Sequence, residues 1–246
     1  MPLPEALFVT RTMRTLELLA LQPLSAPQVA SALEVHPRTA RRLLARLREE
    51  GYLTRGGDAQ RLYRPTMRLV AVAGQVVERS PLARAAVPFV RGLHDETGAA
   101  VHLMVPSYRS AACVVHGAAG CSGRPQLREL VPSHCTAPGK VLLAFRDEWR
   151  ESVLSAPLER CTPRTITDPV RLHAEAAKVR AQGYAIEDGE FRPGLRAVAA
   201  PVFGHDGEAA AALAATVPED GTPEAVAERV TALARELTAT VEALGG

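Results

Sequence analysis

The stretch HPRTARRLLARLREEGYL, residues 36–53, decides the fold of the first part of the chain. It holds five arginines in the eleven positions from 38 to 48, interleaved with leucines. On a helix, which turns about 100° per residue, four apolar residues of this stretch share one face; they are Ala40, Leu43, Leu44 and Leu47. Arg38 and Arg42 fall on the opposite face, so the stretch predicts an amphipathic helix with a basic outer surface.

Two helices are predicted before the basic helix. The first is expected over 9–21, because apolar residues recur there at helical spacing, and its expected core stripe is Val9, Met13, Leu16 and Ala20. Ser25 followed by Gln28 is a capping-box pattern, which opens a short second helix that ends near Leu33.

The basic helix itself is predicted from Pro37 to Glu50, and Gly51 is the residue expected to end it. Two short strand-like runs then flank Gly56-Gly57-Asp58 within residues 52–65, which indicates a hairpin. Three helices, a three-residue turn at 34–36 and a hairpin are typical of a winged helix-turn-helix.

Charge supports a nucleic-acid partner for this part of the chain. Residues 1–66 carry ten arginines and six acidic residues, a net charge of +4, whereas the remaining residues carry a net charge of −2. We therefore expect this module to bind double-stranded DNA. The residues expected to contact bases or phosphates are Arg38, Thr39, Arg41, Arg42, Arg46, Arg11, Arg14, Arg55 and Arg61. The alternative is a solvated arginine face held by ion pairs, but Glu49 and Glu50 stand too late in the helix for us to expect such pairs.

The rest of the chain predicts a module of helices mixed with antiparallel strands. Helical stretches are expected at 66–78, 82–97, from about 137, 169–182 and 223–244. Strand-like runs are expected at 99–105, 111–116, 196–203 and 208–217. The predicted fold class is therefore α+β, with a winged helix-turn-helix domain at 1–66, a linker helix at 67–79 and a second domain at 80–246.

Composition and sequence patterns argue against a membrane-spanning protein and against a secreted one. With 47% hydrophobic and 23% charged residues, the chain is typical of a globular protein. The longest uncharged apolar run, residues 209–217, is too short to span a bilayer. The first twenty residues show no signal peptide and the four cysteines show no CxxC spacing, so we expect a cytoplasmic protein with reduced thiols and no membrane partner.

Three stretches resemble the IclR-type bacterial transcriptional regulators. RTMRTLELLA at 11–20, together with residues 36–53, is similar to the family's DNA-binding module. SHCTAPGKVLLA at 133–144 resembles its histidine-to-GK-helix motif, and GYAIEDGEFRPGLRAVAAPVF at 183–203 resembles its terminal signature. The resemblance implies a winged helix-turn-helix, a linker helix and a GAF-like effector-binding domain. It also implies a regulator, not an enzyme, that needs no cofactor and binds a palindromic operator as a homodimer or a dimer of dimers.

The resemblance further implies an effector pocket, in which several positions depart from the family pattern. The matching positions are Ala137, Pro138, Gly139, Glu187, Ala197, Ala214 and Thr216. Ala197 stands where the family has cysteine, Ala214 stands where it has serine, and Pro138 has no amide hydrogen to donate. We therefore expect a small-molecule effector that is larger and less acidic than a small keto acid. The alternatives are a domain that only dimerises and binds no ligand, and positions that only fill a core.

Histidines and cysteines allow two further interpretations. A metal site could draw on His102, Cys113, His116, Cys121, His134 and Cys135. No spacing among them is a zinc signature, and neighbouring residues such as His134 and Cys135 point to opposite faces of a strand, so no metal site is predicted. A thiol hydrolase would use Cys135 with a histidine within hydrogen-bond reach, and turnover of a generic ester would identify it.

Overall fold

A computed structural model describes residues 4–56, 61–117, 130–218 and 221–244 of the chain. The chain divides into two compact units, Met1–Val76 and Val77–Gly246, and each is described by itself. Among the described residues, none of the helices qualifies as a membrane span.

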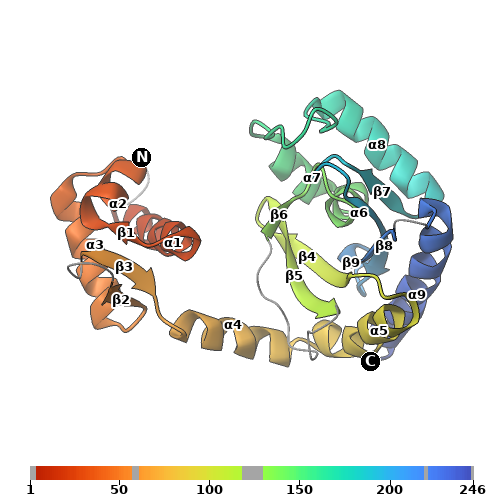
Figure 1. Cartoon of the computed structure of the whole chain (residues 1–246), viewed down its shortest axis with the longest axis horizontal. Coiled ribbons are helices and arrows are strands. Elements are labelled where there is room, and N and C mark those ends of the chain that lie inside the picture. Colours follow the sequence, from red (N-terminus) through yellow and green to blue (C-terminus); the bar gives the residue numbers. More distant parts are fainter. Residues whose placement is uncertain (1–3, 57–60, 118–129, 219–220, 245–246) are drawn as a thin grey trace. The chain divides into compact units, whose positions relative to one another are not determined.

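The first unit contains three whole helices, a three-stranded antiparallel sheet and most of a fourth helix, α4 (Arg68–Arg79) (Figure 1). Its elements in chain order are α1 (Pro4–Leu21), β1 (Leu24–Ser25), α2 (Ala26–Ala32), α3 (Pro37–Glu49), β2 (Leu53–Gly56) and β3 (Leu62–Pro65). The three helices and the hairpin of β2 and β3 confirm the elements expected from the sequence, whereas β1 was not expected; it adds a short edge beside β3. Gly57 and Asp58 of the predicted turn lie outside the described residues.

Local capping explains where α2 and α3 begin. The backbone N–H of Ser25 donates to Gln28 Oε1 at 2.8 Å, so the predicted capping box is present at α2. The Nδ1 atom of His36 accepts from the backbone N–H of Arg38 and caps α3. Gly51 follows the helix with a φ of +77°, a left-handed conformation that favours glycine and ends α3 where predicted.

The predicted core stripe of α1 is wrong at Val9, Met13 and Ala20, which are exposed, and right at Leu16, which packs partly buried against the core. Val9 and Met13 are 56% and 55% exposed, whereas Thr15 and Leu19 are buried. The face of α1 that is buried is therefore not the face that carries the most apolar side chains. Thr15 tolerates burial because its hydroxyl donates to the carbonyl of Arg11 at 2.7 Å, which satisfies the polar group within the helix.

The second unit is built on one antiparallel sheet of six strands, in the order β6-β5-β4-β9-β8-β7 (Figure 1). These strands are β4 (Val101–Ser107), β5 (Ser110–Gly117), β6 (Leu130–Pro132), β7 (Ala185–Asp188), β8 (Arg196–Phe203) and β9 (Ala209–Thr216). Its helices are α5 (Pro81–Thr97), α6 (Ala137–Phe145), α7 (Asp147–Leu154), α8 (Pro169–Gln182) and α9 (Pro223–Leu244), and α4 (Arg68–Arg79) precedes them. The α+β composition of the prediction is confirmed, whereas β6, β7 and α7 were not expected.

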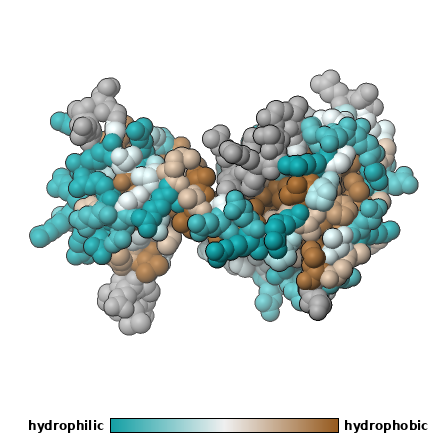
Figure 2. Space-filling view, turned by 90° about the horizontal axis from the view of Figure 1, so that it is seen from below, coloured by the Kyte–Doolittle hydropathy of each residue, from teal (hydrophilic) through white to brown (hydrophobic). Residues whose placement is uncertain are grey.

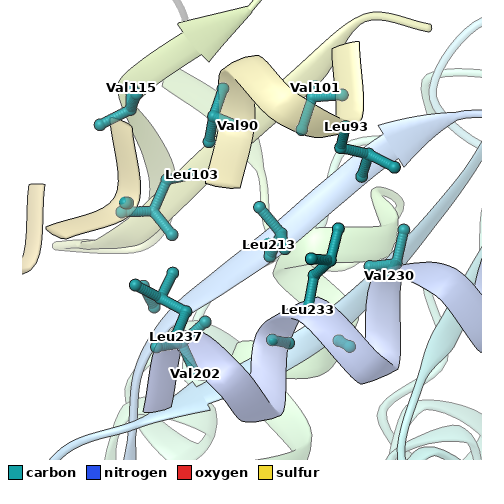
Figure 3. Packing of buried hydrophobic residues seen from close by; sticks show 14 of the residues in the cluster. Val90, Leu93, Val101, Leu103, Val115, Val202, Leu213, Val230, Leu233 and Leu237 are labelled. Atoms are coloured by element: carbon teal, nitrogen blue, oxygen red, sulfur yellow. The ribbon is translucent and has the colours of Figure 1, made fainter. Parts of the chain in front are cut away.

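Helices cover both faces of this sheet. On one face α5 and α9 lie next to each other and pack against the strands. Figure 3 shows Leu213 of β9 between the two helices, with Val90 and Leu93 of α5 on one side of it and Leu233 and Leu237 of α9 on the other. On the opposite face α6 and α8 form a second core with the strands. The helix expected at 223–244 is confirmed as α9 (Pro223–Leu244), and its Val230, Leu233 and Leu237 are buried.

Strand β9 is central in the sheet and consists almost wholly of alanine. Its sequence is AAAALAAT, and neighbouring residues face opposite sides of the sheet. Ala211, Leu213 and Ala215 belong to the core under α5 and α9, whereas Ala212 and Ala214 belong to the core under α6. Small side chains at these positions let α6 lie close to the sheet and leave space beside its N-terminus.

Candidate functional site

A cavity of about 210 Å³ lies in the second unit, beside the start of α6 and the middle of the sheet. It is lined by His102, Met104, Val131, Thr136, Pro138, Glu187, Phe191, Arg192, Leu195, Ala197, Ala214, Ala215 and Thr216. Five of the seven positions expected to form an effector pocket are among them: Pro138, Glu187, Ala197, Ala214 and Thr216. These five come from three separate stretches of the chain, which the fold brings together.

Ala137 and Gly139, the other two expected positions, do not line the cavity but support its wall. Both are buried in the first turn of α6. An added Cβ at Gly139 would lie 2.2 Å from the carbonyl oxygen and 2.4 Å from the Cα of Ser133. Glycine is therefore required here because the backbone of residues 133–136 passes directly against the helix.

Backbone amides at the start of α6 are already used by the protein. The N–H of Ala137 lies near the Glu187 carboxylate and lowers its pKa, and the N–H of Gly139 donates to Thr136 Oγ1 at 3.3 Å. Pro138 between them has no N–H. The first turn of this helix therefore offers few of the donors with which helix N-termini bind anions.

Glu187 is the acidic group of the cavity. It lies on β7, is 2% exposed, and its Oε1 accepts from the backbone N–H of Phe191 at 3.2 Å. Burial raises the pKa of its carboxyl from 4.5 to about 7, because the charged form loses solvation and the nearby Glu190 adds repulsion. Glu187 can therefore donate or accept a hydrogen bond near neutral pH.

Glu187→Gln should remove a pH dependence of stability. Since the pKa is raised to about 7 in the folded state, the free energy of unfolding of the wild-type protein should fall as pH rises from 4.5 to 7. The loss should approach about 3 kcal/mol, because one pKa unit corresponds to about 1.4 kcal/mol. Urea unfolding of both proteins at several pH values checks this, with the exposed Glu148→Gln as control. Parallel curves for wild type and Glu187→Gln would contradict it.

An ion-pair cluster lies behind the cavity wall. Lys140 of α6 is 2% exposed, and its Nζ lies 2.5 Å from Glu190 Oε1 and 3.2 Å from Glu175 Oε1. Burial raises the pKa of Glu190, and the ammonium of Lys140 opposes that effect. The cluster ties α6, α8 and the segment after β7 together and so fixes the cavity on that side.

Sequence reasoning missed eight residues of the cavity: His102, Met104, Val131, Thr136, Phe191, Arg192, Leu195 and Ala215. Strand alternation could have identified His102 and Met104, which share one face of β4. Thr216 was expected to offer a hydroxyl, and its Oγ1 already accepts from the backbone N–H of Ala100 at 3.0 Å. Its hydrogen can still be donated to a ligand.

Histidine and cysteine side chains gather at two places in this unit. The donor atoms of His102, Cys113 and His116 lie within 4.8 Å of one another, and those of His134, Cys135 and Cys161 do likewise. His134 and Cys135 do not diverge on a strand as expected, because both lie in bends between β6 and α6. Cys121 lies outside the described residues.

The histidine next to Cys135 does not form the dyad of a thiol hydrolase. Burial and the neighbouring Cys161 raise the pKa of the Cys135 thiol far above its usual value. His134 uses its Nε2 for the carbonyl of Glu159 at 2.8 Å, and burial lowers the pKa of its imidazole. A buried thiol without a thiolate form near neutral pH is a poor nucleophile.

The first unit presents a basic surface on α3. Ala40, Leu43, Leu44 and Leu47 are buried, as predicted. Arg38, Arg41 and Arg42 are exposed and Thr39 is half-buried. Figure 2 shows that the visible face of this unit, at the left, is largely hydrophilic.

Arg46 differs from the other arginines of α3. Its guanidinium lies 3.5 Å from Glu49 Oε2 and 3.1 Å from Glu50 Oε1. Our expectation that these two acids pair none of the arginines is therefore wrong for Arg46, which lies one helical turn before them. The same acids make no ion pair with Arg38, Arg41 or Arg42 in the described part of the chain.

The other predicted arginines lie on α1 and the hairpin. Arg14 and Arg61 are exposed, and Arg11 is half-buried. Arg55 on β2 is also exposed; its guanidinium donates to the Tyr63 hydroxyl and lies 4.8 Å from the centre of that ring. This contact holds the Arg55 side chain against the hairpin.

Comparisons with known proteins agree with both the sequence motifs and the fold. The family model described as "Bacterial transcriptional regulator IclR C-terminal" matches residues 74–243. The uncharacterized HTH-type transcriptional regulator RhmR of Escherichia coli (strain K12) is 33% identical over 210 residues, which cover 83% of this chain and 80% of RhmR.

Two solved structures resemble the whole chain. A putative IclR transcriptional regulator from Silicibacter sp. TM1040 has a TM-score of 0.79 at 27% identity, covering 97% of this chain and 96% of its own. An IclR homologue from Microbacterium hydrocarbonoxydans, complexed with 4-hydroxybenzoate, has a TM-score of 0.75 at 25% identity, covering 96% and 99%. The extent of these matches shows that the chain belongs to the IclR family of bacterial transcriptional regulators.

Proposed function

We propose that this regulator binds a palindromic DNA operator through residues 1–66, as a dimer or a dimer of dimers, and that a small molecule in the cavity of residues 80–246 modulates binding. The basic face of α3 carries the first part of the proposal. In this interpretation the first unit is a winged helix-turn-helix, α3 is its recognition helix and the β2–β3 hairpin is its wing.

The exposed arginines of α3 support base recognition. Arg38 and Arg42 lie opposite the buried leucines, near the N-terminal half of the helix, where recognition helices meet base edges. Arginine can make two hydrogen bonds to guanine in the major groove, which gives direct sequence discrimination. Arg41 and Thr39 lie beside them and are proposed to contact bases or phosphates.

Phosphate contacts are proposed for arginines on the flanking elements: Arg11 and Arg14 of α1, and Arg55 and Arg61 of the wing. Such contacts position a protein on DNA without reading its sequence. The stacking of Arg55 on Tyr63 restricts its side chain before DNA arrives, which reduces the entropy lost on binding. Arg46 is left out of this set because its charge is already paired.

Assembly is proposed partly from the family and partly from α4. Along this helix Val70, Val72 and Val76 are 51%, 48% and 68% exposed, and Met67 just before it is 75% exposed. Exposed apolar side chains gathered on one helix are typical of a surface that meets another protein. A second copy of the chain would supply the two-fold symmetry that a palindromic operator requires.

Selection from random DNA tests the proposal as a whole. The full-length protein should enrich duplexes that contain an inverted repeat, because a two-fold symmetric dimer presents two equivalent α3 helices. Binding should weaken steeply as salt rises, since counterions are released from each neutralised phosphate. Enrichment of unrelated sequences, or of a single half-site without symmetry, would contradict the proposed operator binding.

The cavity supports an effector with an apolar body and few polar anchors. Its wall combines apolar residues such as Ala197, Ala214 and Met104 with a smaller set of polar ones, namely Glu187, Thr216, Thr136, His102 and Arg192. The amides that would favour a small carboxylate are occupied within the protein. The solved homologue with 4-hydroxybenzoate shows that a family member binds an aromatic compound.

A ligand panel should separate aromatic compounds from small keto acids. We expect at least one monocyclic aromatic compound from a panel that includes 4-hydroxybenzoate to raise the melting temperature, whereas pyruvate and glyoxylate at millimolar concentration should not. A ligand at about 100 times its Kd stabilises the folded state by about 2.7 kcal/mol, which differential scanning fluorimetry detects easily.

Glu187→Ala should abolish the ligand-induced shift, and the exposed Glu148→Ala should retain it. Saturable binding of a two- or three-carbon keto acid in calorimetry would show that Ala197 and Ala214 do not prevent the cavity from accepting small keto acids. If no compound of a broad panel binds, the alternative of a ligand-free dimerisation domain is favoured.

A further inference from the structure

Two imidazoles and a thiol converge beside the cavity, on the face of the sheet that packs against α6. Nδ1 of His102 lies 2.8 Å from Nδ1 of His116 and 3.8 Å from Sγ of Cys113. The two rings are 4.5 Å apart between centroids. Two like ring nitrogens at this distance can share only one hydrogen, so at least one Nδ1 lone pair points toward the other ring.

A β-bulge creates this cluster. His102 on β4 is directly paired with His116 on β5, and Leu103 is paired with Val115. The register then shifts, so that the next residue of β4, Met104, is paired with Cys113. Regular alternation would place Cys113 and His116 on opposite faces, since three positions separate them. The extra residue at the bulge turns Cys113 to the face of His102 and His116.

We propose that His102, Cys113 and His116 form a binding site for Zn²⁺ or a similar transition-metal ion in the wall of the cavity. In a tetrahedral zinc site, bond lengths of about 2.0–2.1 Å to nitrogen and 2.3 Å to sulfur place two nitrogens about 3.3 Å apart and a nitrogen and a sulfur about 3.6 Å apart. The two separations from His102 Nδ1 need to change by only about half an ångström or less, and the donor atoms of His116 and Cys113 already lie within 4.8 Å of each other. Two imidazoles and one thiolate are ligands that zinc favours.

Binding has a defined proton balance. The ring that carries its hydrogen on Nδ1 moves it to Nε2, so both Nδ1 lone pairs face the ion and neither imidazole loses a proton overall. The Cys113 thiol releases one proton to solvent and binds as thiolate. Three protein ligands leave a fourth position for water or another donor. Because His102 also lines the cavity, the ion would fix one side chain of the cavity wall.

The second group of donors is a weaker candidate. A metal ion bound there would need two thiolates, those of Cys135 and Cys161, in addition to His134. The two Sγ atoms lie 3.7 Å apart. Glu187 and Glu190 repel negative charge at Cys135 and help to raise its pKa. A site that needs one thiolate is therefore favoured over one that needs two thiolates beside carboxyl groups. The proposal does not depend on whether the cavity binds an effector.

Cobalt substitution tests the site in the full-length reduced protein. Co²⁺ added to the metal-free wild type should bind with a stoichiometry of one per chain and give tetrahedral ligand-field bands and a thiolate charge-transfer band, and Zn²⁺ should displace it. Cys113→Ser should lose the charge-transfer band. Cys113→Ser and His116→Gln should each weaken Zn²⁺ binding more than about 100-fold, since loss of mere outer-shell partners costs about 10–100-fold.

The double variant Cys135→Ser/Cys161→Ser is the matched control and should keep the band and the affinity. Circular dichroism and urea unfolding establish that each variant is folded. If Cys113→Ser does not fold, the affinity of His116→Gln for Zn²⁺ is the deciding measurement. The proposal is overturned if the band survives in Cys113→Ser, if it disappears in the double variant instead, or if the wild type binds neither Co²⁺ nor Zn²⁺ stoichiometrically.

Discussion

Arg42→Ala should weaken binding to the selected operator roughly 5- to 150-fold, because one bidentate arginine–guanine contact contributes about 1–3 kcal/mol of discrimination. Arg42 is exposed on α3 and lies opposite the buried Leu43, Leu44 and Leu47, so its removal should leave the fold unchanged. An electrophoretic mobility-shift titration at fixed salt measures the loss. The same titration on an unrelated duplex should show a smaller change, which separates base recognition from general attraction.

Arg46→Ala is the control for this variant. It removes the same charge from the same helix, but its guanidinium is paired with Glu49 and Glu50 in the present structure. Its effect on operator affinity should therefore be several-fold smaller than that of Arg42→Ala. Equal losses for both arginines would show that net charge, and not the face of α3, governs binding. Wild-type affinity of Arg42→Ala would refute its role in base recognition.

Gly139→Ala should destabilise the second unit by about 3 kcal/mol or more, since overpacking against atoms that cannot move exceeds the usual cost of an added methyl group. The new Cβ would lie 2.2 Å from the carbonyl oxygen of Ser133 and 2.6 Å from its carbonyl carbon, both of them backbone atoms. Relief of this contact requires α6 to move away from residues 133–136. Urea unfolding of the full-length protein measures the effect, and ligand binding should be lost with it.

Gly92→Ala provides the matched control within the same unit. Gly92 lies inside α5, and an added Cβ there would meet no atom within 4 Å. This substitution should stabilise the protein by up to about 1 kcal/mol, because alanine has a higher helix propensity than glycine. If the two variants unfold at the same urea concentration, the close approach at Gly139 is not a constraint on the fold.

Local signals in the sequence were sufficient for most helices and for the hairpins. Asp168 and Pro169 begin α8, where the Asp168 side chain accepts from the N–H of Val170, and Gly183 ends it with a φ of +82°. These signals act between residues a few positions apart, so they can be recognised without knowledge of the tertiary fold. The leucine face of α3 was predictable for the same reason: one strong periodic pattern fixed both its core and its solvent side.

Features that depend on contacts between distant segments were not predictable. The buried face of α1 follows Thr15 and Leu19, and periodicity favoured Val9 and Met13 because it ranks apolar residues and ignores a hydroxyl satisfied within the helix. Pairing register decides whether Cys113 meets the two histidines, and a bulge leaves no clear mark in the sequence of β5.

The candidate effector site was predictable only in part. Family resemblance supplied the positions of Glu187, Ala197 and Ala214, which line the cavity as a group. It did not show that the amides of Ala137 and Gly139 face groups of the protein itself, since these contacts depend on how β7 and residues 133–136 meet α6. Physical contacts thus added the stronger reason for expecting an apolar effector.

In the alanine-rich strand β9, the backbone supports the fold of this unit, whereas the side chains shape the cavity. Hydrogen bonding to β4 and β8 fixes the course of β9 whatever side chains it carries, and Ala214 together with Ala197 on β8 shapes the cavity by what these positions lack. One added methyl or hydroxyl group at either position would alter the accommodated molecule without disturbing the strand pairing. Under the proposed function, such a scaffold would permit an evolving lineage to exchange one effector for another in single mutational steps while residues 1–66 stay the same.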